Sequence, residues 1–342
     1  MKRILALTTL AAMAGSAARA DGKLTISNYF EYMPQELLDK FSAETGVTVT
    51  MDTYDSNEAL LAALKAGKMG QYDIAVPQDF MVKIMTDEGL LDTIAPGEIP
   101  NIANVLPEWI DVPFDPGRMH SIPYQWGSTS FSVNRDVYKG PIDSLAVIFA
   151  PPPELDGKIN ALDSQSEVLA LASFYLGIPQ CSSDREQLKA LNDLVLEAKT
   201  HWASFGSDTA KDVLVSGDAA AGMIYNGFSA KARAEGVNIE YALPKEGYVA
   251  WMDNAVLLRD APNRANAILF MNFLLVPENN AALTNYAAYT SAVAGVEPFL
   301  TAEQKASPET NPPADAPKGI FIQACDEAVQ RNYDAIWTNL KK

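Results

Sequence analysis

Four short segments of the chain place aromatic residues beside acids or amides. They are Tyr29-Phe30-Glu31-Tyr32, Gln78-Asp79-Phe80, Tyr225-Asn226 and Trp251-Met252-Asp253. Each follows a segment with the pattern of a buried strand, or lies just outside one. A single segment of this kind is usually an ordinary mixture of core aromatics and solvated acids. Four of them at equivalent positions of an αβ topology predict one shared ligand-binding site.

The pairing of aromatic rings with carboxylates suits a ligand that is both cationic and apolar. A polyamine has this chemistry, because methylene spacers separate its ammonium groups. A charged hydrogen bond to a buried ammonium contributes roughly 1.5–3 kcal/mol. An aromatic face adds about 0.5–2 kcal/mol, and each covered methylene adds about 0.8 kcal/mol. Carboxylates spaced along an aromatic slot therefore read both the charge and the length of the ligand.

Motifs for catalysis are missing from the sequence. We find no phosphate-binding glycine loop, no nucleophile elbow and no paired-histidine zinc helix. The two histidines, His120 and His201, lie far apart in the sequence and do not make a metal site with two cysteines. A Ser/His/Asp triad can be assembled on paper from any chain with two histidines. We therefore expect no enzyme activity, no metal and no cofactor.

Alternating elements are needed to position these segments. Strand patterns at 23–28, 47–54 and 73–76 alternate with helix patterns that begin at Pro34 and after Ser56. This βαβαβ order predicts a parallel sheet covered by helices. Such sheets bind ligands beyond the carboxyl ends of their strands.

A second αβ set occupies about residues 131–244. The other elements that we expect are strands at 158–162, 222–225 and 255–258, helices at 167–176, 185–200, 263–275 and 323–340, and a surface loop at 308–317. Two such sets predict two lobes, because a mature chain of roughly 320 residues exceeds one comfortable core.

The chain is strongly acidic. It has 26 Lys and Arg against 43 Asp and Glu, which gives a net charge of −17. This charge argues against nucleic acid or an anionic membrane as the partner, because both are polyanions. It favours a cationic ligand only weakly, since many proteins are acidic for solubility alone.

The first twenty residues have the pattern of a cleaved signal peptide. Lys2 and Arg3 precede an apolar run at 4–14, and Ala18-Arg19-Ala20 is a small-x-small cleavage site. We expect export to the periplasm, and no later apolar run is long enough for membrane insertion. In that oxidising compartment Cys181 and Cys325 can pair, but the sequence leaves the pairing open.

The order of motifs along the mature chain resembles the periplasmic spermidine/putrescine-binding proteins of ABC importers. The matching segments are N-Y-F-E-Y-M-P at 28–34, F-S-A-E-T-G-V-T-V at 41–49, T-Y-D-S-N-E at 53–58, Y-D-I-A-V-P at 72–77, P-F-D-P at 113–116, S-I-P-Y-Q-W-G at 121–127, G-M-I-Y-N-G at 222–227, P-K-E-G at 244–247 and W-M-D at 251–253. Many matches in the same order are far more specific than one motif.

The resemblance implies an α/β fold of the type II, or Venus-flytrap, periplasmic binding protein kind. Two lobes with mixed sheets flanked by helices then close about a hinge. We expect lobe I at 21–128 and 249–296 and lobe II at 129–248 and 297–342, after a signal peptide at 1–20.

The resemblance also implies the ligand contacts. Glu31, Glu167 and Asp253 match carboxylates that hold ammonium groups, and Tyr32 and Trp251 match the walls of the slot. The full set of candidate positions is Tyr29, Glu31, Tyr32, Gln78, Asp79, Phe80, Ser164, Glu167, Tyr225, Trp251, Asp253, Tyr289 and Gln323.

Several candidates depart from the family pattern. Relatives commonly have Trp at the positions of Tyr29 and Tyr225, and Ser and Tyr at those of Gln78 and Phe80. An acid often stands at the position of Ser164. We hypothesise that Asp79 supplies a replacement carboxylate from the opposite lobe.

The resulting hypothesis is a monomeric periplasmic protein that captures a polyamine of the putrescine/spermidine class between its lobes. It delivers this ligand to the membrane subunits of an ABC importer. One alternative is the same architecture with another cationic solute, such as a quaternary amine or a guanidinium compound. A polyamine sensor is a second alternative, and a secreted enzyme is the alternative from a different class.

Overall fold

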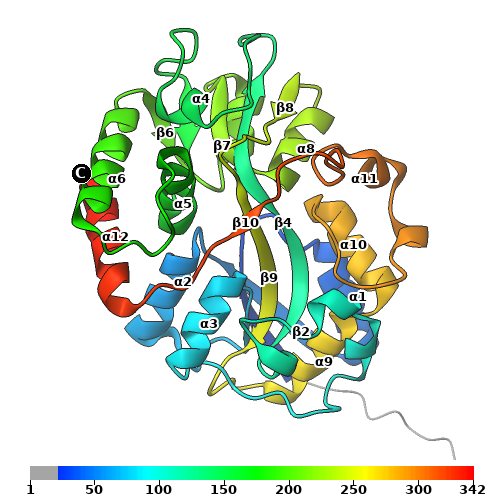
Figure 1. The fold of residues 1–342 in the computed structure, drawn as a ribbon. Helices are drawn as coiled ribbons and strands as arrows, with labels where there is room; N and C mark the ends of the chain where they lie inside the picture. Colours follow the sequence, from blue (N-terminus) through cyan, green and yellow to red (C-terminus); the bar gives the residue numbers. More distant parts are fainter. Residues whose placement is uncertain (1–21) are drawn as a thin grey trace, which may run out of the picture.

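Two long strands cross the centre of the molecule and connect its two lobes (Figure 1). They are β4 (Ser121–Asn134) and β9 (Val249–Leu257), which pair antiparallel from Ser121↔Val256 to Thr129↔Val249. The computed structural model describes residues 22–342, so the expected signal peptide at 1–20 lies outside the described residues. A chain of two lobes joined by continuous strands has the architecture expected for a Venus-flytrap protein.

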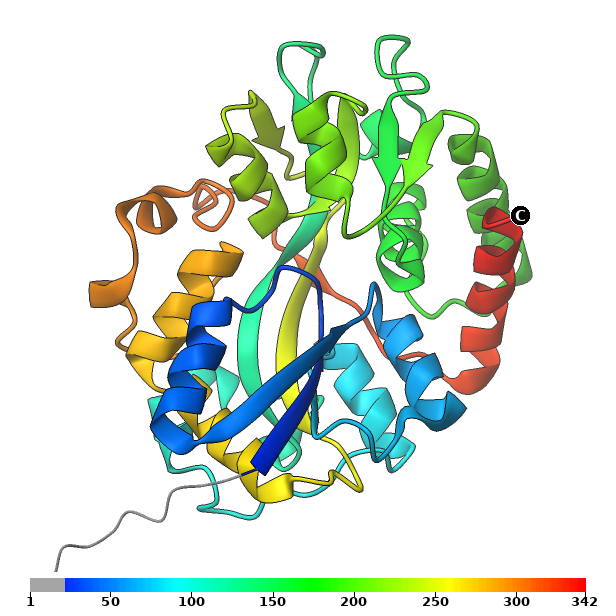
Figure 2. The same cartoon turned by 180° about the vertical axis from the view of Figure 1, so that it is seen from behind.

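Within the described residues, the strands form one curled sheet in the order β2-β1-β3-β9-β4-β7-β5-β6. Lobe I contains the parallel strands β1, β2 and β3, and lobe II contains β5, β6, β7 and β8. The strand bounds are β1 (Gly22–Asn28), β2 (Val47–Thr53), β3 (Ile74–Ala75), β5 (Ile159–Ala161), β6 (Trp202–Phe205), β7 (Ala221–Tyr225), β8 (Ile239–Tyr241) and β10 (Ile320–Phe321). Seen from behind, β1 and β2 lie at the lobe I end of this sheet (Figure 2).

Helices cover the sheet in both lobes. Lobe I has α1 (Gln35–Thr45), α2 (Asn57–Ala63), α3 (Asp79–Asp87), α9 (Arg264–Leu274) and α10 (Pro277–Ala287). Lobe II has α4 (Ala146–Phe149), α5 (Gln165–Leu176), α6 (Arg185–Lys199), α7 (Ala210–Ser216) and α8 (Asn226–Ala234). The short helix α11 (Ala302–Ala306) precedes the segment that returns to lobe II, where α12 (Glu327–Leu340) lies beside α6 (Figure 1).

Local sequence explains why the lobe I helices begin and end where they do. Helix α1 follows Pro34 and ends at Gly46, which adopts the left-handed conformation that glycine tolerates. Helix α2 begins after Ser56, whose hydroxyl accepts a hydrogen bond from the amide of Ala59. The buried face of α1, including Phe41, packs against Phe270 of α9 at 4.9 Å between ring centroids. The first aromatic segment, at 29–32, lies between β1 and α1.

Two elements differ from the sequence-based expectation. The strand expected at 255–258 begins at Val249, because β4 pairs with it across both lobes. Trp251 and Asp253 therefore lie inside a strand and not beyond its end. The last helix begins at Glu327 and not at 323, because residues 320–326 form a strap across the lobes with β10 paired to β9.

The strap is attached to lobe II by a disulfide. Cys181 and Cys325 are bonded, which settles the pairing that the sequence left open. In the chain-entropy account, a disulfide that closes a long loop stabilises the fold by about 2–4 kcal/mol. The expected lobe boundaries at 128/129, 248/249 and 296/297 stay a prediction.

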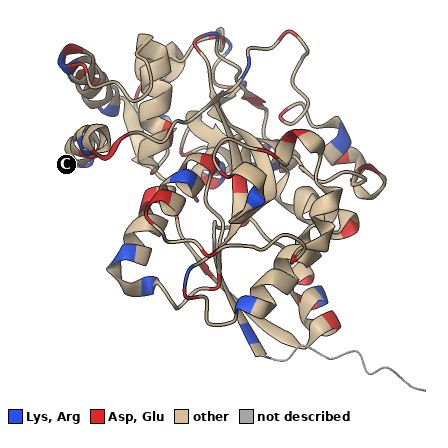
Figure 3. Cartoon of the chain, turned by 60° about the horizontal axis from the view of Figure 1, so that its bottom comes forward, with Lys and Arg blue, Asp and Glu red and all other residues tan. Residues whose placement is uncertain are grey.

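Charged side chains lie mostly on the helices and loops, and the central strands are largely uncharged (Figure 3). Among residues 22–342, no helix has the length and apolar character that a bilayer span requires.

Candidate ligand-binding site

A small cavity lies between the two lobes, with a volume of about 30 Å³. Its lining comes from both lobes and from β9. The lining residues are Tyr29, Phe30, Tyr32, Asp55, Gln78, Asp208, Tyr225, Phe228, Trp251, Asp253 and Tyr289. A volume of this size matches one water molecule. A larger ligand therefore enters only if side chains or lobes move apart.

Aromatic rings form most of the wall. The ring of Trp251 lies 5.0 Å from that of Tyr289 and 6.3 Å from that of Tyr225, both edge to face. Tyr32 lies 5.3 Å from Tyr289 and 5.8 Å from Tyr29. Edge-to-face packing leaves ring faces available for a cation or a methylene chain.

Two glycines provide the space for these rings. Gly127 pairs with Trp251 across β4 and β9, and a Cβ there would lie 2.7 Å from the indole ring. A Cβ at Gly227 would lie 2.5 Å from the ring of Tyr289. Both distances are too short for a side chain, so glycine at these positions permits the aromatic wall. Both glycines stand in motifs of the family resemblance, S-I-P-Y-Q-W-G and G-M-I-Y-N-G, but were not among the candidate site residues.

Asp253 is the deepest acid of the cavity. Side chains two residues apart in a strand share a face, so β9 directs Asp253 and Trp251 to the same side. Oδ2 of Asp253 accepts a 2.6 Å hydrogen bond from the hydroxyl of Tyr32. Its Oδ1 is buried and has no hydrogen-bond partner among residues 22–342. Burial raises the pKa of Asp253 well above its usual value, although the Tyr32 hydrogen bond opposes this shift.

Gln78 and Glu167 join the two lobes. Nε2 of Gln78 in lobe I donates to Oε1 of Glu167 in lobe II at 2.7 Å. Glu167 is fully buried behind Gln78 and does not line the cavity. Burial raises its pKa to about 7, opposed by the hydrogen bond from Gln78. Oε1 of Gln78 and Oε2 of Glu167 have no partners within the described chain.

Asp79 and Phe80 point away from the cavity. Oδ2 of Asp79 accepts the amide of Met252 at 2.9 Å, and its Oδ1 accepts the amide of Phe80 at 2.6 Å. Burial raises the pKa of Asp79 to about 7, against these two hydrogen bonds. Both oxygens thus hold backbone in place, so the geometry does not support Asp79 as a replacement ligand carboxylate. The ring of Phe80 packs in a separate apolar cluster of lobe I.

Three further candidates also lie outside the cavity. Glu31 forms an ion pair with Lys231 of lobe II, with its Oε2 3.6 Å from Nζ. Ser164 is the buried residue that precedes α5. Gln323 is exposed on the strap, where it lines a second cavity of about 720 Å³ between α2, α3, α5 and α12. Of the thirteen predicted positions, the structure brings Tyr29, Tyr32, Gln78, Tyr225, Trp251, Asp253 and Tyr289 to the first cavity.

Sequence reasoning missed Asp55, Asp208 and Phe228 as lining residues, and it placed Phe30 in a site segment but not among the candidate positions. Asp55 stands in the quoted motif T-Y-D-S-N-E, two residues beyond the end of β2. Asp208 follows β6 in the same way. The rule that ligands bind beyond the carboxyl ends of strands could have found both acids.

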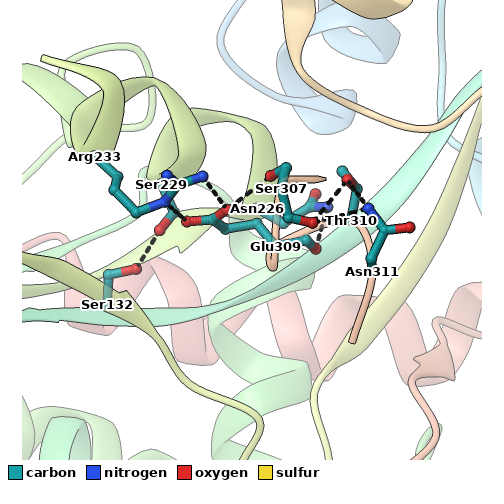
Figure 4. Close-up of polar contacts among 8 residues, drawn as sticks. All are labelled: Ser132, Asn226, Ser229, Arg233, Ser307, Glu309, Thr310 and Asn311. Carbon is teal, nitrogen blue, oxygen red and sulfur yellow. Dashed lines mark hydrogen bonds and ion pairs between the residues drawn. The ribbon is translucent and has the colours of Figure 1, made fainter. Parts of the chain in front are cut away.

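A polar network supports the wall of lobe II. The amide side chain of Asn226 accepts from the amide of Ser128 in β4 at 3.0 Å and donates to the carbonyl of Glu309 at 3.1 Å. Figure 4 shows Glu309 held in turn by two hydrogen bonds from Arg233 and one from Ser307. This network fixes the turn between β7 and α8, where Tyr225 enters the cavity.

Comparisons with known proteins agree with this geometry. The profile of the family described as bacterial extracellular solute-binding protein matches residues 36–312. The chain is 34% identical over 311 residues to the spermidine/putrescine-binding periplasmic protein of Escherichia coli K12, covering 90% of this chain and 87% of that protein. It is 32% identical to the putrescine-binding periplasmic protein SpuD of Pseudomonas aeruginosa UCBPP-PA14, covering 99% of this chain and 98% of that one.

A solved structure described as a spermidine/putrescine ABC transporter protein from Listeria monocytogenes superposes with a TM-score of 0.88. It is 28% identical and covers 93% of this chain and 98% of that one. The two-lobed fold, the cavity between the lobes and these matches lead to one conclusion. The chain belongs to the bacterial extracellular solute-binding protein family.

Proposed function

We propose that this protein is the solute-binding component of an ABC importer and that its ligand is a polyamine. The observation that carries this proposal is the buried Oδ1 of Asp253, which has no hydrogen-bond partner within residues 22–342 and lies in a cavity walled by aromatic rings. A buried carboxylate without a cation costs free energy. An ammonium group supplied by a ligand removes that cost, and the rings of Trp251 and Tyr225 cover the attached methylenes.

Polyamine capture also explains why contacts come from both lobes. Asp253 and Gln78 of the lobe I side and Tyr225 of lobe II line the same cavity. A ligand that touches both lobes favours the closed arrangement over an open one. The closed form is then the species that the importer's membrane subunits bind in the periplasm. The protein acts as a monomer in this scheme, and no bond is made or broken.

A calorimetric titration tests this proposal. Putrescine, cadaverine, spermidine and spermine are titrated into the protein, with a betaine and an arginine-like guanidinium compound as controls. We expect saturable heat for at least one polyamine and none for the betaine, because a quaternary amine cannot donate a hydrogen bond to Asp253. Heat from a control compound and from none of the four polyamines overturns the proposal.

A further inference from the structure

We propose that Asp55 and Asp208 form a second ammonium site at the rim of the interlobe cavity, so that the protein selects amines with two cationic ends. This inference rests on the polyamine function proposed above. It names two carboxylates that neither the sequence analysis nor the family resemblance assigned to the ligand.

The topology brings these two acids together from opposite ends of the sheet. Asp55 follows β2 and Asp208 follows β6, which are the first and last strands of the order β2-β1-β3-β9-β4-β7-β5-β6. The curl of the sheet places both side chains on the lining of the same cavity. One acid belongs to each lobe, so a cation held by both contacts both lobes.

No Lys or Arg among residues 22–342 forms an ion pair with either acid. Within residues 22–342, neither Asp55 nor Asp208 takes part in an ion pair or accepts an N–H hydrogen bond. The nearby lysines have other partners: Lys231 pairs with Glu31, and Lys211 pairs with Asp212 and Glu235. The two acids therefore form a carboxylate pair that lacks a cationic partner within the described chain.

The side chains of Asp55 and Asp208 are neighbours on the lining of this cavity. Burial raises the pKa of Asp208, and the neighbouring charge of Asp55 and the charge of Glu31 raise it further. Repulsion between two neighbouring carboxylates disfavours the state in which both are ionised. An ammonium group placed between them removes the repulsion and displaces the proton.

An independent observation points to a ligand in the same cavity. Oδ1 of Asp253 and Oε1 of Gln78 are buried acceptors without partners in the described chain, and both residues line the cavity. Asp253 and Gln78 are each 4% exposed, whereas Asp55 and Asp208 lie toward solvent. The cavity therefore has acceptors at a deep end and at a rim, with aromatic rings on its walls. A diamine satisfies both ends at once.

The experiment compares two ligands with the same carbon chain, 1,4-diaminobutane and butylamine. Each is titrated into the wild-type protein, Asp55→Asn, Asp208→Asn, the double variant and Asp253→Asn. Intrinsic tryptophan fluorescence follows weak binding, and calorimetry follows strong binding. Asp212→Asn is the matched control, because it removes one negative charge from lobe II outside the cavity.

We expect each rim variant to weaken diamine binding about 10-fold, in the range of one charged hydrogen bond. Butylamine binding stays within about twofold of wild type in the same variants, because butylamine has one ammonium group that Asp253 holds. Asp253→Asn weakens both ligands, and Asp212→Asn weakens neither. Diamine binding to the wild type also releases protons near neutral pH, and this release is smaller in Asp208→Asn.

Unchanged diamine affinity in both rim variants overturns the inference. An equal loss for the diamine and the monoamine also overturns it, because the acids then act through the general field. Absence of any polyamine binding by the wild-type protein instead contradicts the proposed function itself. Thermal unfolding without ligand shows whether each variant is folded.

Discussion

Two regions of this protein bury carboxylates and treat them in opposite ways. Glu309, in the loop after α11, is bound by the guanidinium of Arg233 through two hydrogen bonds of 2.8 and 2.9 Å. Asp253, in β9, receives one hydroxyl hydrogen bond and no cation from the described chain. The pKa of Glu309 is lowered because Arg233 and Ser307 outweigh its burial, whereas burial raises the pKa of Asp253.

The difference separates a structural acid from a binding acid. An internally neutralised carboxylate holds two segments together and has little to offer a ligand. A carboxylate without a cation destabilises the unliganded protein and gains most when a cation arrives. The protein thus gives up stability at Asp253 in return for affinity.

The largest expected effect follows from Asp253→Asn. Removing the charge weakens polyamine binding about 10- to 100-fold, in the range of a buried charged hydrogen bond. The unliganded protein keeps or gains stability, because an unpaired buried carboxylate is gone. Calorimetry measures the first effect and thermal unfolding measures the second. Wild-type affinity in this variant contradicts the assignment of Asp253.

The pH dependence at this site follows from the raised pKa. An unfolded Asp ionises near pH 4, so stability that depends on Asp253 falls as pH rises from there toward its folded pKa. Polyamine affinity rises over the same interval, because the ligand binds the carboxylate. Both slopes become shallower in Asp253→Asn, and the remainder belongs to Glu167 and Asp208.

The second largest effect is expected for Glu309, the structural acid, and it concerns stability. Glu309→Gln lowers the free energy of unfolding by about 1–2 kcal/mol, because Arg233 loses its charged partner but keeps a half-buried position. The stabilisation by Glu309 is present above its unfolded pKa, and it is lost as pH falls through the lower folded pKa. Urea unfolding near pH 7 and near pH 4 measures both. If Glu309→Gln weakens ligand binding as strongly as Asp253→Asn does, Glu309 is not a purely structural acid and the contrast with Asp253 is wrong.

Glu167 is an intermediate case, since Gln78 binds one of its oxygens and the other has no partner in the described chain. We expect Glu167→Gln to weaken polyamine binding about three- to tenfold, less than Asp253→Asn does. Because the pKa of Glu167 is raised to about 7, the unliganded wild type loses stability as pH rises toward 7. The variant flattens this slope in thermal unfolding, and an unchanged slope assigns it to other groups.

The smallest effect belongs to Glu31, whose pair with Lys231 is partly solvent-exposed. Glu31→Gln changes ligand affinity by about 1 kcal/mol or less, and added salt removes the difference. Titrations at low and high ionic strength measure it. A large, salt-independent loss returns Glu31 to the role of a direct ammonium partner that the resemblance implied.

The sequence predicted the parts of the site that depend on local pattern. The strand patterns placed Tyr29 and Tyr225 at strand ends. They also placed Trp251 and Asp253 outside the strand expected at 255–258, whereas both residues lie inside β9. The same reasoning selected Asp79 as a candidate but gave it the wrong role, that of a ligand carboxylate. Its actual role is to accept a hydrogen bond from the amide of Met252 in β9. Neighbouring residues in the sequence do not reveal such a long-range hydrogen bond.

Two other features depended on the curl of the sheet. Asp55 and Asp208 meet because the first and last strands of the sheet approach one another, and no local pattern records that approach. Gln323 moved out of the predicted site for a similar reason, since the disulfide and β10 fix the strap on which it lies. Fold class therefore followed from periodicity and motif order, while contacts between distant segments required the structure.

The crossing strands have a mechanical consequence. When one lobe turns against the other about β4 and β9, points on these strands travel least and points far from them travel most. Trp251 and Asp253 lie on β9, close to the axis of this rotation. The distance between them therefore stays the same as the lobes open. Asp55 and Asp208 lie at the rim of the cavity, one in each lobe, so the distance between them changes as the lobes turn. An amine can thus bind Trp251 and Asp253 first, and Asp55 and Asp208 then come together around its other end.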